Sequence, residues 1–297
     1  MERLSHAVLA KLSGLSGPKL DEFATVWQTL PVEERRRASR ALRDMAEENI
    51  EFEFGSVFSL ILSDEDSEVR SSAIEGLWED DRSSTADRLI ALANADPAVT
   101  VRADAIAALG RFVQRVALGE LSNRVSERIR SAILRLVDDE HPLPVRRRAI
   151  EAVGYLGDSD AIAICRRAYA STDAGTRASA IRAIGRTCDP IWIDIIIREL
   201  GSDDPEMRFE AAQAAGEIED SRALPALLAA VRDEDPEVRL AVIAALGAIG
   251  GQEARQTLQS VARGKDPALV EAATAALGEL DVVGDPVGLR VHDINPN

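Results

Sequence analysis

Residues 235–247 read DPEVRLAVIAALG, and related stretches recur along the chain at a fixed spacing. Each regular copy contains an arginine 31 residues after the previous one, and a glycine follows that arginine eight residues later. The regular copies pair Arg146 with Gly154, Arg177 with Gly185, Arg208 with Gly216 and Arg239 with Gly247. A period of roughly 20 to 50 residues is typical of solenoids, in which each repeat is one supersecondary unit.

Each repeat contains two predicted helices. Asp235 before Pro236 predicts a helix start, because the Asp side chain accepts from unpaired backbone N–H groups and Pro has no N–H to leave unpaired. A second periodic segment over 253–261 predicts the partner helix. The apolar residues of the first helix recur at the i, i+3, i+4, i+7 spacing: Val238, Ala241, Val242, Ala245, Leu246 and Ile249. Neither helix can bury its apolar stripe alone, so neighbouring pairs are expected to stack.

The pattern weakens toward the N-terminus. Arg102 is still followed by Gly110 at the expected distance, whereas Arg70 is followed by Trp78 at the glycine position. The step from Arg102 to Arg146 is 44 residues, which predicts an insertion of about thirteen residues that lengthens two helices.

We therefore predict three parts. They are degenerate N-terminal capping repeats over 1–58, a repeat solenoid over 59–280 with the insertion near 111–137, and an extended C-terminal tail over 281–297.

Asp-Pro-x-Val-Arg, the run of alanines and the closing Leu-Gly or Ile-Gly together resemble HEAT repeats, specifically the short bacterial subgroup called phycobilisome-lyase-like. The resemblance implies an all-α fold, a right-handed α-solenoid of about eight helix pairs, with the Asp-Pro helices lining its concave face. It also implies that the recurring arginines bond to Asp or backbone groups of adjacent turns. This predicted structural ladder consists of Arg70, Arg102, Arg146, Arg177, Arg208 and Arg239.

Positions that differ from repeat to repeat are candidates for binding. A helical wheel places them opposite the core, toward the predicted concave groove. Aromatic and Arg side chains are frequent interface anchors. We predict a protein- or peptide-binding surface formed by Trp78, Arg147, Glu151, Arg182, Phe209, Gln213 and Leu240. The alternative is that these side chains pack against neighbouring helices.

Charge limits the choice of partner. The net charge of −16 argues against a nucleic-acid or anionic-membrane surface, since both need basic patches. Residues 111–148 are the exception, with nine Arg against five acidic residues. This segment either steers an acidic partner or is a solvated helix face.

Catalytic chemistry has little support in the sequence. Di-iron hydroxylases of this architecture use His-Glu pairs, but none of the three histidines is followed by Glu. His141 stands at a helix start where other repeats place Asp, which favours a capping role. Cys165 lies in an apolar helix and Cys188 in a turn, so neither is a promising nucleophile. We predict no enzyme activity, no metal and no cofactor.

The resulting prediction is a non-enzymatic, cytoplasmic interaction scaffold that binds a partner protein or peptide on its concave face. The two cysteines give no disulfide framework, and no apolar run is long enough for a signal-peptide core or a membrane span. Two alternatives stay open: a bilin lyase or bilin-binding chaperone, which the repeat subgroup implies, and a HEAT-like DNA glycosylase, which the acidic balance opposes. The partner and the oligomeric state are not predicted.

Overall fold

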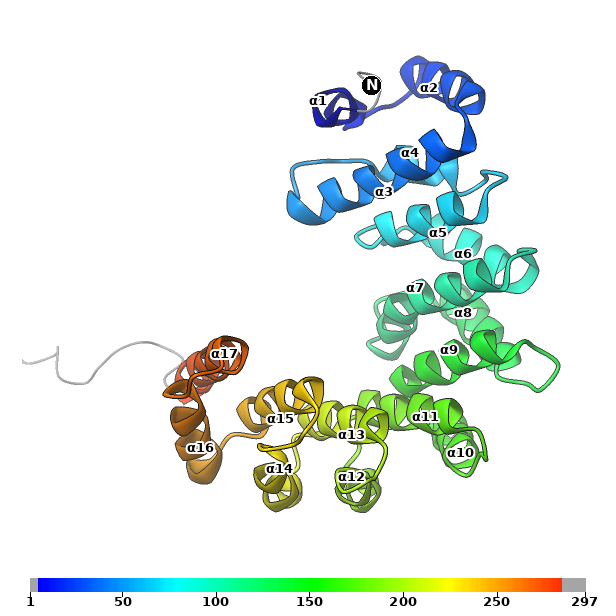
Figure 1. Cartoon of the computed structure of the whole chain (residues 1–297). Coiled ribbons are helices and arrows are strands. Elements are labelled where there is room, and N and C mark those ends of the chain that lie inside the picture. Colours follow the sequence, from blue (N-terminus) through cyan, green and yellow to red (C-terminus); the bar gives the residue numbers. More distant parts are fainter. Residues whose placement is uncertain (1–4, 285–297) are drawn as a thin grey trace, which may run out of the picture. The chain divides into compact units, whose positions relative to one another are not determined.

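The computed structural model describes residues 5–284. Over these residues the chain is helical with short connections, and no strand occurs (Figure 1). Packing divides the chain into two compact units, one ending at Val153 and the other beginning at Gly154. We call them unit 1 and unit 2 and describe each by itself.

Unit 1 contains two rows of helices. The row that carries the recurring arginines, here called the arginine row, consists of α3 (Val32–Glu48), α5 (Ser67–Gly76), α7 (Val99–Ala117) and α9 (Leu143–Val153), which pack in that order. The partner row consists of α2 (Pro18–Thr29), α4 (Gly55–Ile61), α6 (Ser83–Ala95) and α8 (Asn123–Leu136). The short α1 (His6–Leu9) precedes both rows and contacts α3.

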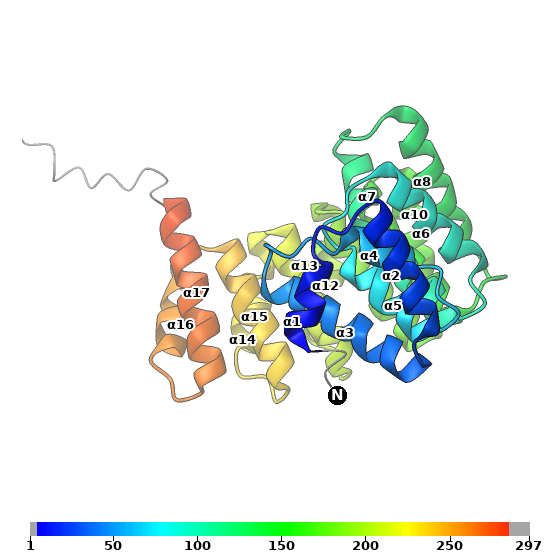
Figure 2. The same cartoon turned by 90° about the horizontal axis from the view of Figure 1, so that it is seen from above.

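Unit 2 repeats this arrangement after a short 3-10 turn, η3 (Gly154–Leu156). Its arginine row is α11 (Ala174–Arg186), α13 (Pro205–Ile218), α15 (Pro236–Ile249) and α17 (Pro267–Gly284), and its partner row is α10 (Ser159–Tyr169), α12 (Ile193–Glu199), α14 (Leu224–Ala230) and α16 (Gln252–Ala262). Each partner-row helix lies beside the arginine-row helix that follows it, as α14 and α15 and then α16 and α17 show in Figure 2.

Asp235, predicted to start a helix, is the N-cap of α15, and Asp204 is the N-cap of α13. The Asp235 carboxylate accepts from the backbone N–H of Glu237 at 2.8 Å and of Val238 at 3.3 Å. Asp204 accepts from Glu206 at 3.0 Å in the same way. These bonds satisfy backbone donors that a helix N-terminus leaves unpaired.

The apolar stripe predicted for the helix that contains Val238, which is α15, is almost wholly buried. Val242 and Leu246 are fully buried, and Val238, Ala241 and Ala245 nearly so. Small residues at these positions allow neighbouring helices of the arginine row to approach closely. Burial of this stripe between stacked pairs supplies the core of each unit.

Two predicted boundaries can be compared with the structure. In the insertion predicted near 111–137, α7 extends to Ala117 and α8 spans Asn123–Leu136. At the other end, α17 continues to Gly284, so residues 281–284 are helical rather than part of an extended tail. No helix-breaking residue precedes Gly284 in that stretch, and residues 285–297 lie outside the described part of the chain. Within the described part, none of the helices combines the length and the apolar character that crossing a bilayer requires.

Candidate functional site

Arg208 connects two turns of unit 2. Its Nε donates to Asp233 Oδ2 at 2.7 Å and its Nη2 to Asp233 Oδ1 at 2.8 Å, which is a bidentate ion pair. Its Nη1 donates to the carbonyl of Ser202 at 2.9 Å. The side chain is buried. Its guanidinium thus pairs with a carbonyl of the turn before α13 and with a carboxylate of the turn before α15.

The other recurring arginines make related contacts. Arg70 in unit 1 donates to Asp96 at 2.7 and 2.8 Å and to the carbonyl of Asp64 at 2.8 Å. Arg239 and Arg177 donate to carbonyls of the turns that precede their helices, and Arg146 pairs with Asp139. All six side chains are therefore engaged within the repeats and are not displayed as a row of free cations.

Arg102 is the irregular member of this set. It donates to the carbonyl of Ala93 at 3.1 Å and to His141 Nδ1 at 3.3 Å. The regular acidic partner lies 25 or 26 residues after the arginine, and the thirteen-residue insertion moves the equivalent position to His141. His141 thus stands in the place of the acid in this repeat, which accounts for its role without invoking a metal.

The ion pairs lower carboxyl pKa values. The hydrogen bond from Arg208 holds the pKa of Asp233 below its usual 3.8, and Arg36 does the same for Asp66. A carboxyl group whose folded pKa is lowered stabilises the fold above its unfolded pKa, and that contribution is lost as the pH falls through the folded value. These pairs therefore contribute fully at neutral pH.

The recurring glycines form a second set of internal contacts. An added Cβ at Gly154 would lie 2.2 Å from the Ala183 carbonyl oxygen, and one at Gly216 would lie 3.2 Å from Ala245 Cα. The same relation joins Gly185 to Ala214 and Gly247 to Ala276, with the alanine 29 residues after the glycine each time. The glycines thus allow close backbone approach between successive helices, as Gly247 of α15 does toward Ala276 of α17.

Part of the predicted binding surface comes together on the arginine row of unit 2. Phe209 and Leu240 are half-buried at equivalent positions of the neighbouring helices α13 and α15, and Gln213 is exposed one turn after Phe209. Arg182 of α11 reaches α13, where its Nε donates to Glu210 Oε2 at 2.9 Å. We call the area formed by these five residues the unit 2 surface.

Two predicted members, Arg147 and Glu151, lie in α9 of unit 1. Glu151 is 6% exposed, and its carboxylate accepts from Arg148 at 2.8 Å, three residues earlier in the same helix. Arg147 is half-buried and makes interactions of its own. The helical wheel fixes the direction of Cα–Cβ only, so it does not anticipate how far the side chain is exposed.

Trp78 does not lie in a helix of the arginine row. Helix α5 ends at Gly76, and Trp78 stands in the following turn, 46% exposed. It lines a groove of about 540 Å³ together with Ile50, Phe52, Phe54 and other residues. Sequence reasoning did not single out residues 50–54, although two closely spaced Phe residues in a chain with 4% aromatics would have been a usable signal.

A model of HEAT repeats matches residues 56–127, 113–185, 167–235 and 193–278. The chain belongs to the HEAT-repeat family. The predicted all-α solenoid fold is thereby confirmed, and the contacts of Arg and Gly described above are made between HEAT repeats. No curated protein matches the sequence.

Solved structures of the same class are similar in fold and distant in sequence. The complex of CpcE and CpcF of phycocyanin lyase from Nostoc sp. PCC7120 has a TM-score of 0.57 at 16% identity, covering 90% of this chain and 97% of that one. Importin beta has a TM-score of 0.49 at 16% identity, with 93% and 42% covered. Human deoxyhypusine hydroxylase has a TM-score of 0.39 at 18% identity, with 88% and 96% covered.

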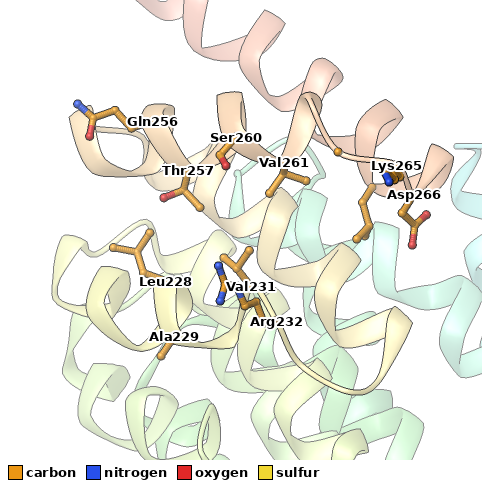
Figure 3. Close-up of a pocket in the computed structure, with 12 residues that line it drawn as sticks. Leu228, Ala229, Val231, Arg232, Gln256, Thr257, Ser260, Val261, Lys265 and Asp266 are labelled. Atoms are coloured by element: carbon orange, nitrogen blue, oxygen red, sulfur yellow. The ribbon is translucent and has the colours of Figure 1, made fainter.

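A groove in the HEAT repeats of unit 2 lies on the partner row. It has a volume of about 740 Å³ and is open to solvent between α14 and α16. Leu228, Val231 and Arg232 of the α14 side face Thr257 and other residues of α16 across it (Figure 3). The lining mixes apolar side chains with single charges, so the groove is a shallow amphipathic surface.

The HEAT repeats contain two free cysteines, the buried Cys165 and the exposed Cys188. Burial raises the pKa of the Cys165 thiol to about 12, and burial together with Glu217 and Glu219 raises that of Cys188. Both thiols are therefore protonated at neutral pH, whereas a cysteine nucleophile needs its thiolate. Among residues 5–284 no three His, Cys, Asp or Glu side chains gather as metal ligands would.

Proposed function

We propose that this HEAT-repeat protein is a non-enzymatic interaction scaffold that binds a partner protein or peptide at the unit 2 surface. The observation that carries the proposal is the contrast between repeated and variable positions. The recurring arginines and glycines make contacts within and between repeats. In contrast, Phe209 and Leu240 are half-buried at equivalent positions of neighbouring helices. A framework needs the same contact in each repeat, and a selective surface needs unlike side chains.

The chemistry of the unit 2 surface suits a protein or peptide ligand. Phe209 and Leu240 offer apolar contact area, and Gln213 beside them offers amide donors and an acceptor. The ion pair between Arg182 and Glu210 fixes both side chains at the edge of this area, so their positions are set before a partner arrives. Aromatic and Arg side chains are enriched among the residues that dominate interface energies.

The test is a double substitution with a matched control. Phe209→Asp with Leu240→Asp places two charges where apolar contact is proposed. Ile191→Asp places one on an exposed apolar residue of the 3-10 turn Pro190–Trp192, which precedes the partner-row helix α12. Proteins captured from the native host are quantified by mass spectrometry, and the circular dichroism of each variant is recorded to verify its fold.

We expect the double variant to lose partners that wild type and Ile191→Asp both capture. The Kd of the double variant for such a partner should rise by about thirtyfold or more, because a central anchor contributes about 2 kcal/mol. If a folded double variant captures the same partners as wild type, the proposal is wrong.

A further inference from the structure

The groove beside Trp78 in unit 1 is a second surface with unusual composition. We call it the Trp78 groove and define it by Ile50, Phe52, Phe54, Phe58 and Trp78. Ile50 is 75% exposed and Trp78 46%, and both line the same volume of about 540 Å³. Single exposed apolar side chains are normal on a protein surface, whereas two large ones that line one groove offer a ligand a shared apolar contact area.

The floor of the groove is aromatic and packed. The rings of Phe52 and Phe54 stack with centroids 5.3 Å apart, and Phe54 meets Phe58 edge to face at 6.3 Å. Phe58 itself lies against Gly76, where an added Cβ would come within 2.3 Å of the ring. The three Phe and Trp78 are four of the eleven aromatic Phe, Trp and Tyr residues of the chain. An aromatic-poor protein thus concentrates its aromatic side chains here.

The C-terminal part of α7 holds the turn that carries Trp78. Arg111 Nη2 donates to the carbonyls of Leu77 at 2.9 Å and Asp80 at 3.0 Å. Arg115 Nη1 donates to the carbonyl of Asp81 at 3.1 Å. Arg111 is the ninth residue after Arg102, a position that is helical in the regular repeats too, whereas Arg115 lies in the part of α7 that those repeats lack. The two departures from the repeat, Trp78 in the glycine position and the lengthened α7, therefore meet in one structural feature and fix the turn before any ligand binds.

The rim of the groove is acidic. Glu53 and Glu79 line it, and neither forms an ion pair with a cation within residues 5–284. Asp80 also lines it but is neutralised by Arg82, whose Nε donates to its Oδ1 at 2.9 Å. The free charge at the rim is thus two carboxylates, which favours a cationic ligand by electrostatic complementarity.

We propose that the Trp78 groove binds a peptide segment in which a large apolar side chain is flanked by Lys or Arg. The apolar side chain contacts Trp78, Ile50 and the Phe floor, and the cations pair with Glu53 and Glu79. A second copy of this chain is a poor occupant, because its net charge of −16 opposes approach to an acidic rim. This site lies in unit 1 and does not depend on the unit 2 surface, so either proposal can fail alone.

The experiment uses a random dodecapeptide display library selected on the full-length protein, followed by affinity measurements with the enriched peptides. We expect enriched peptides to carry net positive charge and at least one large apolar residue. Trp78→Ala should weaken their binding about thirtyfold, and Leu118→Ala, an exposed apolar residue of the same unit, should leave it unchanged. Glu53→Gln with Glu79→Gln should weaken binding about tenfold at low salt and flatten its salt dependence.

The control for charge is Asp21→Asn with Glu22→Gln, which removes two exposed acids of α2. Enrichment of neutral or acidic peptides, or binding that Trp78→Ala leaves intact, overturns the proposal. So does an absence of enrichment over the Trp78→Ala protein. Concentration-dependent dimerisation in sedimentation experiments that Trp78→Ala abolishes would assign the groove to a second copy instead.

Discussion

Replacing Arg208 with Ala is expected to lower the free energy of unfolding of unit 2 by about 3–5 kcal/mol, the usual cost of removing one partner of a buried ion pair. The substitution leaves the Asp233 carboxylate without its bidentate donor and the Ser202 carbonyl without a hydrogen bond. Urea unfolding followed by circular dichroism measures the change.

Two further variants show whether burial and geometry are the cause. Arg222 pairs with Asp220 through the same bidentate kind of contact, but its side chain is 56% exposed against 10% for Arg208. Arg222→Ala should therefore cost only about 0–1 kcal/mol. Arg208→Lys should recover little stability, because an ammonium group cannot reproduce the fork of guanidinium donors.

The pH dependence supplies a check on the same pair. The lowered pKa of Asp233 means that the pair stabilises unit 2 at neutral pH and is lost as the pH falls below about 4 and through the folded pKa. The difference between wild type and Arg208→Ala should shrink over that range. Equal losses for Arg208→Ala and Arg222→Ala at pH 7 would contradict the role given to burial.

Gly154→Ala is the second substitution with a large expected effect. The added Cβ would lie 2.2 Å from the Ala183 carbonyl oxygen and 2.8 Å from its Cα. Backbone atoms cannot turn away as a flexible side chain can, so η3 and α11 must move apart. We expect unit 2 to lose about 2–3 kcal/mol in the free energy of unfolding, the range for overpacking a close contact.

Gly278 provides the control in the same row. It lies in α17, and no neighbouring atom would come within 4 Å of an added Cβ. Gly278→Ala should leave stability unchanged or raise it by up to about 1 kcal/mol, because Ala has the higher helix propensity. A Gly154→Ala protein as stable as wild type in urea would show that close approach is not what the recurring glycine provides.

The repeated residues were predictable because one physical demand recurs in each repeat. The spacing of Arg208 and its equivalents implied contacts that tie adjacent turns, and the Asp-Pro pairs implied helix starts. The position of Trp78 was not predictable by register. Where other repeats place a glycine against an alanine of the next helix, an indole does not fit, and α5 ends two residues earlier.

The hydrogen bonds from Arg111 to the turn of Trp78 could not be predicted from the sequence either. Its acceptors are backbone carbonyls more than thirty residues away, and a carbonyl is present in any residue type. The position of His141 opposite Arg102 follows from the length of the insertion, but only once the regular spacing between an arginine and its acid is known from Arg208 and Arg70. The contacts of irregular residues therefore could not be predicted from the repeat, whereas those of the recurring arginines could.

The central claim is that recurring residues hold the stack together while variable ones are free to determine binding. Its most direct test is the urea unfolding of the double variant Phe209→Leu with Gln213→Ala, which gives α13 the residues that α15 has at Leu240 and Ala244. We predict a free energy of unfolding within about 1 kcal/mol of wild type, as for substitutions outside the core. A loss of about 3 kcal/mol, as large as that expected for Arg208→Ala, would contradict the claim.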